Sequence, residues 1–137
     1  MTPMPAALLD QVIHWSAPAQ TQLQTFRMLF HDVAATADIG PLDESLKWGQ
    51  PAWRPRAPRT GSTLRLNWSA ADPARITAYV DCKTDLAAQM HLRFPDLPGN
   101  DGRRALSFNL SDPNTEALWQ LAHLTFTYHR AKQGSAR

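Results

Sequence analysis

Cysteine is nearly absent from this sequence, which contains only Cys82 among its 137 residues. A disulfide within one chain is therefore impossible, and so is a metal cluster held by several cysteines of one chain. Long apolar runs are also missing, since none approaches the ~18 residues that a membrane helix requires. Residues 1–10 contain no basic residue and no apolar stretch as long as that of a signal peptide. We expect a cytoplasmic protein that has no membrane partner.

A strong excess of charge of either sign is absent as well. The chain has 14 lysine and arginine residues against 12 aspartate and glutamate residues, which gives a formal net charge of +2. Proteins that wrap nucleic acid usually carry a larger positive excess, so nucleic acid is not the expected partner. Hydrophobic residues make up 43% of the chain, which excludes a disordered or collagen-like protein. This length and composition predict a single domain over residues 1–137, with one core.

Apolar residues at helical spacing predict helices near both ends of the chain. The first is expected over residues 5–15, and the second begins after a cap at Ser16 and ends before Gly40 and Pro41. A third helix is expected from Asp85 to about Phe94, and a last one from residue 113 to about 131, before a tail over 133–137 that we expect to fray. The buried stripe of the second helix is predicted to be Leu23, Phe26, Phe30, Val33 and Ala37.

Alternation of apolar and polar residues predicts strands in the middle of the chain. The clearest are 63–68 and 75–82, joined by a turn at Asp72 and Pro73, and two more are expected at 42–48 and 105–110. The proline-rich stretch 49–61 is expected to be at most an edge strand with a loop. Strands grouped together, with one helix inserted, predict an α+β fold. Its small antiparallel sheet packs with N-terminal and C-terminal helices.

The segment from Glu44 to Trp53 reads E-S-L-K-W-G-Q-P-A-W. It resembles the signature E-x-x-K-W-G-x-P-x-aromatic of the YdhG-like family of bacterial domains of unknown function. The likeness extends over residues 21–131, supported by similar patterns at 82–86, 94–97 and 124–130. The resemblance implies an α+β fold with a small antiparallel sheet. It also implies a link to iron, because one relative is described as a frataxin-like iron chaperone.

A ligand cleft is predicted around the signature segment. Trp48 shares an expected strand face with Leu46 and is assigned to the core. Trp53 lies beyond Pro51, in a stretch unsuited to a central strand, and is assigned to the cleft rim. We predict a non-enzymatic domain that binds a small anionic or aromatic ligand, or a metal complex. The candidate ligand-binding residues are Glu44, Lys47, Trp53, Arg54, Arg56 and Lys83.

Two of the polar candidates carry specific expectations. Glu44 and Lys47 are three residues apart, so in a strand they lie on opposite faces, which argues against a direct acid–base pair.

Cys82 is expected to be a small buried hydrophobe at the inward end of its strand. A thiol next to Lys83 and a helix start would be activated, but no histidine lies nearby in the sequence to act as its base.

Other functions remain open at this stage. Arg54, Arg56 and Arg59 lie on a proline-stiffened loop that either binds phosphate or carboxylate groups of a protein or nucleic acid, or contacts only water. An iron-chaperone-like carrier and an enzyme of unfamiliar geometry are further alternatives.

The histidines give no support for a metal site. No pair among the five has the spacing of a helical metal site, and no HExxH motif is present. We therefore assign no catalytic residue, no metal and no cofactor, and leave open whether the protein is a monomer or a homodimer.

Overall fold

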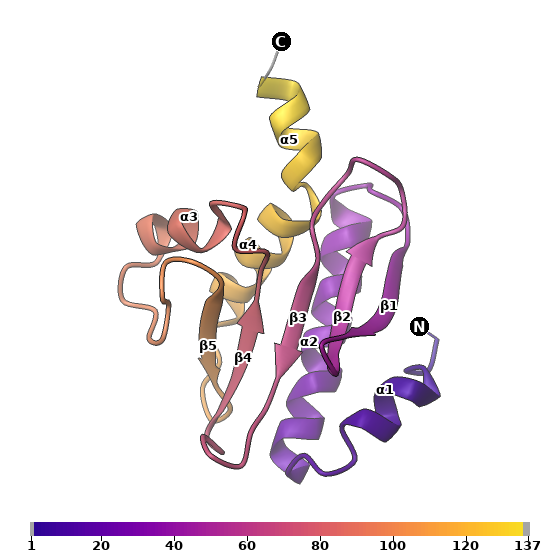
Figure 1. The fold of residues 1–137 in the computed structure, drawn as a ribbon, viewed down its shortest axis with the longest axis vertical. Coiled ribbons are helices and arrows are strands. Elements are labelled where there is room, and N and C mark those ends of the chain that lie inside the picture. Colours follow the sequence, from indigo (N-terminus) through magenta and orange to yellow (C-terminus); the bar gives the residue numbers. More distant parts are fainter. Residues whose placement is uncertain (1, 136–137) are drawn as a thin grey trace.

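The computed structural model describes residues 2–135, which form five helices and one five-stranded sheet (Figure 1). The strands are β1 (Leu42–Lys47), β2 (Gln50–Pro55), β3 (Leu64–Asn67), β4 (Arg75–Tyr79) and β5 (Ala105–Asn109). The helices are α1 (Ala6–Gln11), α2 (Ala17–Thr36), α3 (Leu86–Arg93), α4 (Thr115–Phe126) and α5 (Tyr128–Ser135). No helix within residues 2–135 is both long and apolar enough to cross a membrane.

The strands follow one another across the sheet in chain order, β1-β2-β3-β4-β5, and every neighbouring pair is antiparallel. The chain leaves the sheet once, to form α3 between β4 and β5. Helices α2 and α4 lie on one face, which we call the inner face, while the middle of the opposite, outer face carries no helix (Figure 1). The predicted α+β fold is therefore confirmed, including its inserted helix.

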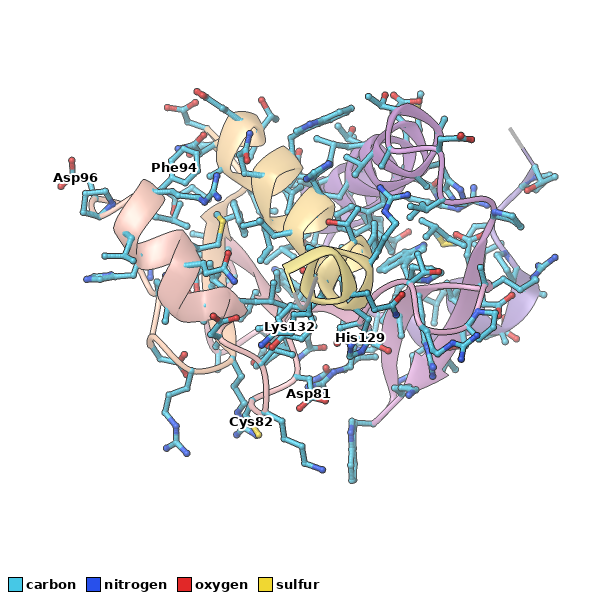
Figure 2. All side chains as sticks on the ribbon, turned by 90° about the horizontal axis from the view of Figure 1, so that it is seen from above. Asp81, Cys82, Phe94, Asp96, His129 and Lys132 are labelled. Atoms are coloured by element: carbon cyan, nitrogen blue, oxygen red, sulfur yellow. The ribbon has the colours of Figure 1, made fainter. Side chains whose placement is uncertain are left out.

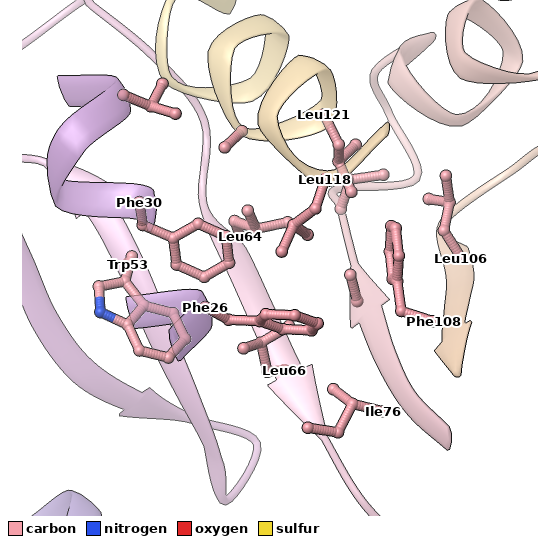
Figure 3. Packing of buried hydrophobic residues seen from close by; sticks show 14 of the residues in the cluster. Phe26, Phe30, Trp53, Leu64, Leu66, Ile76, Leu106, Phe108, Leu118 and Leu121 are labelled. Carbon is pink, nitrogen blue, oxygen red and sulfur yellow. The ribbon is translucent and has the colours of Figure 1, made fainter. Parts of the chain in front are cut away.

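The core lies between the inner face and helices α2 and α4 (Figure 3). Aromatic rings form its centre. Phe30 of α2 meets Trp53 edge-on, with ring centroids 5.0 Å apart, and meets Phe126 of α4 at 6.0 Å. Phe26 meets Phe108 of β5 at 6.1 Å in the same geometry, which aromatic quadrupoles favour. These contacts tie α2 to β2, to β5 and to α4. Most of the apolar stripe predicted for α2 is confirmed, since four of its five residues are buried: Leu23, Phe26, Phe30 and Val33.

Strand β2 is not an edge strand, contrary to the prediction from its prolines. It pairs with β1 along its whole length and with β3 at only two positions, Ala52 with Arg65 and Trp53 with Leu64. Pro51 and Pro55 flank this short ladder, so neither missing N–H group interrupts it. A strand with two prolines is thus accommodated inside the sheet because its second ladder is short.

The turn between β1 and β2 explains why the two tryptophan assignments were wrong. Trp48 and Gly49 connect the directly paired Lys47 and Gln50, and both have a positive φ, 56° and 72°, as in a type I′ hairpin. Trp48 therefore lies outside the strand, and its side chain is 87% exposed instead of buried. Trp53 is fully buried at 0% exposure, because its strand position faces the helices.

The C-terminal helix is broken, whereas the sequence predicts a continuous one. The interruption is at Thr127, between α4 and α5. Here the loop between β2 and β3 competes for backbone groups, since the Ser62 N–H donates to the Thr125 carbonyl and the Arg130 N–H donates to the Thr60 carbonyl. Helix α5 continues through Ser135, so the first three residues of the tail expected to fray are helical. Residues 136–137 lie outside the described residues.

Candidate functional site

Glu44 and Trp53 of the signature segment form a cross-strand pair on the inner face. Glu44 of β1 lies directly opposite Trp53 of β2, and the Trp53 Nε1 donates to Glu44 Oε2 at 2.8 Å. The Arg27 guanidinium of α2 donates to both carboxylate oxygens, through Nε at 2.5 Å and Nη2 at 2.7 Å. His31 Nε2 lies 3.3 Å from the same carboxylate. The Glu44 carboxylate is therefore already bound by side chains of the protein itself and is not free to bind a ligand.

The electrostatics of this cluster favour a permanent charge pair. Burial would raise the pKa of Glu44, but hydrogen bonds from Arg27 and Trp53, with a smaller contribution from His31, outweigh burial and lower it to about 2. The side chains of Glu44 and Arg27 are only 10% and 4% exposed. Of the six predicted ligand residues, Glu44 and Trp53 thus lie in the interior, and the rim position expected for Trp53 is wrong.

A concave feature lies on the outer face of the sheet, beside the hairpin of the signature segment, and we call it the outer-face hollow. It has a volume of about 470 Å³, within the range of small-molecule sites. Figure 2 shows Asp81 and Cys82, two of its residues, on the side of the molecule opposite α2. Its lining comes from the β1–β2 turn and from the ends of β3, β4 and β5: Lys47, Trp48, Ser62, Thr63, Arg65, Val80, Asp81, Cys82 and Arg104.

Positive charge dominates this hollow. Its described lining contains Lys47, Arg65 and Arg104 against one carboxylate, Asp81. Burial lowers the pKa of Arg65, and the neighbouring positive charge of Arg104 lowers it further. Within residues 2–135, none of the three cations makes a salt bridge. Three cations against one carboxylate leave the hollow with a net positive charge, which favours an anion there.

Arg65, which lines the hollow, is oriented by two neighbouring side chains. It comes from β3, whose outward positions face away from the helices, and its Nη1 donates to Gln50 Oε1 at 2.9 Å. Its guanidinium carbon lies 5.2 Å from the centre of the Tyr79 ring, directly across the strand pair. Amide and aromatic partners orient the guanidinium without neutralising it, so its charge is available to a ligand.

Cys82 and Lys83 lie at the β4 end of the hollow. Cys82 is exposed, so the prediction that it is buried is wrong. The strand ends at Tyr79, and a turn follows in which Asp81 accepts from the Lys83 N–H at 2.9 Å, which ends the alternation before Cys82. Lys83 is exposed next to Cys82 but is not part of the lining.

The three arginines of the 54–59 stretch are placed differently from one another. Arg56 donates to Asp43 across the hairpin at 2.8 Å, and both side chains are more than half exposed. Arg54 and Arg59 instead line a second hollow beside α5. The structure therefore brings Lys47 into the outer-face hollow and Arg54 into a separate one. Glu44 and Lys47 lie on opposite faces of β1, as the sequence predicts.

Three hollow-lining residues, Arg65, Arg104 and Asp81, were missed by sequence reasoning. The alternation of residues 63–68 places Arg65 on the wet face, which was the available signal. No local pattern brings Arg104, from the segment before β5, next to Arg65.

Among the described residues, no group of three or more His, Cys, Asp or Glu side chains is arranged to hold a metal ion. Comparisons with models of protein families, with curated proteins and with solved structures found no match.

Proposed function

We propose that the protein is a non-enzymatic binding domain that takes a small anionic ligand carrying an aromatic ring in the outer-face hollow. One observation supports this most directly: Arg65, Arg104 and Lys47 share a single open hollow with one carboxylate. Arginine binds carboxylate and phosphate through two parallel hydrogen bonds, which suits both ligand classes.

Trp48 supports the aromatic part of the proposal. A bulky residue with a positive φ is uncommon, and in a type I′ turn asparagine or glycine is preferred. Trp48 keeps this conformation although its side chain is 87% exposed and gains little from packing. Backbone strain that brings no packing benefit is typical of functional positions. At the edge of the hollow, the indole is available to stack on a ring.

The YdhG-like resemblance stays a prediction, and the hairpin supplies a structural reason for its motif. Glu44 and Trp53 pair across the strands, and Trp48 and Gly49 make the turn between them. The motif therefore sets the hairpin that carries Lys47 and Trp48 to the hollow. Of the residues in the motif, Lys47 and Trp48 are the ones on which the proposal depends, and not the buried pair of Glu44 and Trp53.

The ligand class is tested with adenosine monophosphate and benzoate, which join an anionic group to a ring, and with adenosine, which lacks the anion. Binding is followed by quenching of tryptophan fluorescence, with Trp48→Phe to show that Trp48 supplies the signal. We expect saturation by at least one of the anionic probes and none by adenosine. The variant Arg65→Gln with Arg104→Gln should weaken binding about tenfold or more, since hydrogen bonds to charged groups contribute about 1.5–3 kcal/mol.

Two controls make the test specific. The variant Arg56→Gln with Arg75→Gln removes the same charge outside the hollow and should leave the affinity unchanged. Alkylation of the exposed Cys82 should slow when a probe occupies the hollow, because Cys82 lines it. Equal affinity for both double variants, or no saturation by either anionic probe, would refute the proposal.

A further inference from the structure

A second cationic hollow lies between the end of β2, the loop after it and α5, and we call it the helix–loop hollow. Its volume is about 480 Å³. Two labelled members, His129 and Lys132, project from α5 in Figure 2. The complete described lining is Arg54, Arg59, His129, Lys132 and Gln133. It shares no residue with the outer-face hollow, so it is a separate site.

The two walls of this hollow are fastened to each other. Gln133 Nε2 donates to the Arg59 carbonyl at 2.8 Å, and the Arg130 N–H donates to the Thr60 carbonyl at 3.0 Å. Next to them, Gly61 approaches the Phe126 carbonyl so closely that an added Cβ would lie 2.0 Å from its oxygen. The loop therefore follows the end of α4 and the start of α5, and the backbone positions that carry Arg59 and Lys132 are held next to each other without a ligand.

Positive charge outweighs negative charge in this hollow, where the influence of a carboxylate on Lys132 comes from Asp85, outside the lining. Among the described residues, no aspartate or glutamate lines it, whereas Arg54, Arg59 and Lys132 carry permanent charge. Lys132 Nζ lies 5.0 Å from the centre of the Tyr128 ring, which orients it without neutralising it. None of the three makes a salt bridge within residues 2–135, in contrast to Arg56 nearby, which is paired with Asp43.

We propose that the helix–loop hollow binds phosphate groups. Three permanent cations and a histidine, drawn from β2, the loop after it and α5, match the several oxygens of a phosphate better than the two of a single carboxylate. The described lining has no exposed tryptophan, tyrosine or phenylalanine to stack on a base or ring, so recognition rests on charge. The phosphate comes either from a small phosphate ester or from the backbone of a single-stranded nucleic acid, and these sources share this chemistry.

Two probes separate the sources. Inorganic pyrophosphate is titrated by calorimetry, and a fluorescent oligothymidylate of about 15 nucleotides, near the size of common single-strand sites, is followed by anisotropy. The site variant is Arg54→Gln, Arg59→Asn and Lys132→Gln, with asparagine at 59 because that residue has φ 57°. The charge-matched control is Arg56→Gln, Arg75→Gln and Arg93→Gln, none of which lines the hollow. All substituted residues except the partly buried Arg75 are exposed, and thermal melts verify that both variants fold.

We expect the site variant to weaken binding of at least one probe about tenfold or more, and the control to stay within about twofold. If the oligonucleotide binds, log K should fall with log salt with a slope of about −2, as three neutralised phosphates of a single strand predict, and the site variant should lose most of that slope. Binding of pyrophosphate alone supports a small phosphate ester as the source, whereas binding of the oligonucleotide alone supports a nucleic acid backbone.

Three results would overturn the proposal. The first is that neither probe binds. The second is that the site variant and its charge-matched control lose affinity equally. The third is that the Arg65→Gln and Arg104→Gln variant loses affinity for a probe while the site variant retains it. The last result would place phosphate in the outer-face hollow instead. Because the two hollows are tested with separate variants, this proposal can fail while the proposed function stands, and the reverse is also possible.

Discussion

Replacing Trp48 by asparagine should stabilise the protein, although the residue is a large aromatic in the signature segment. A side chain with a Cβ in the left-handed region costs about 1–2 kcal/mol, and asparagine tolerates this region several times better than most residues. The Trp48 indole is 87% exposed, so little buried surface is lost. We therefore expect Trp48→Asn to raise the free energy of unfolding by about 0.5–1 kcal/mol.

The opposite result is expected for Trp53, which is fully buried against Phe30. Truncating a buried tryptophan to alanine costs about 3–5 kcal/mol. The change also removes the Nε1 donor of Glu44. Because Trp53→Ala threatens folding altogether, Trp53→Phe serves as a second variant that keeps most of the packing and removes the donor, and it should cost about 1–3 kcal/mol.

Urea unfolding followed by circular dichroism measures all three variants, and the midpoints are compared at equal slope. The thermal midpoint of Trp48→Asn should rise by about 2–4 °C per kcal/mol gained, as expected for a domain of this size. Probe binding to the same variant should weaken. If Trp48→Asn lowers the midpoint, the indole packs in solution, and the interpretation of its strain as functional is wrong.

The remaining predictions concern acid, packing and metal. Glu44 has a pKa of about 2 in the folded protein and an ordinary pKa of 4.5, so the unfolded state binds more protons between these two pH values. The free energy of unfolding should therefore fall as the pH drops from about 5 towards 2. Urea midpoints taken across that range should show this loss, and Glu44→Gln should flatten it. Gly61→Ala should cost at least about 1–3 kcal/mol in thermal or urea melts, because its Cβ would collide with the Phe126 carbonyl, and a neutral result would show that the loop relaxes. Elemental analysis after dialysis should return less than about 0.2 equivalents of iron or zinc, and a value near one would revive the iron-carrier alternative.

Local patterns predicted the parts of the fold that alternate or repeat regularly. The alternation around Leu64 and Leu66, and around Ile76 and Ala78, placed the inward residues correctly, because a half-buried strand shows a period of two. The helical stripe from Leu23 to Ala37 was recognised for the same kind of reason, and only its last member, Ala37, is partly rather than fully buried. These elements bury one face against a single neighbouring layer, so their burial can be read from spacing alone.

The tryptophans and arginines were placed wrongly or missed because their positions depend on other parts of the chain. Alternation was extended one residue too far at Trp48, since a tryptophan gives no sequence signal for a type I′ turn. The prolines of the 49–61 stretch led to the prediction that Trp53 lies at an edge. A proline lacks the N–H that a central strand needs, but the ladder between β2 and β3 is so short that neither proline has to donate to it. Arg65 and Arg104 come together only through the order of the strands, which no local pattern contains.

Arg27 joins segments that are far apart in the chain. Besides Glu44 of β1, its guanidinium donates to the carbonyl oxygens of Thr2 at 2.8 Å and Pro3 at 3.3 Å. Thr2 and Pro3 are exposed but accept from a buried guanidinium, so cutting after Met4 would leave buried donors without acceptors. For anyone attaching a tag or a fusion partner, the consequence is practical. An extension that pulls Thr2 and Pro3 away disturbs the hairpin through Glu44, and with it the position of Lys47 and Trp48.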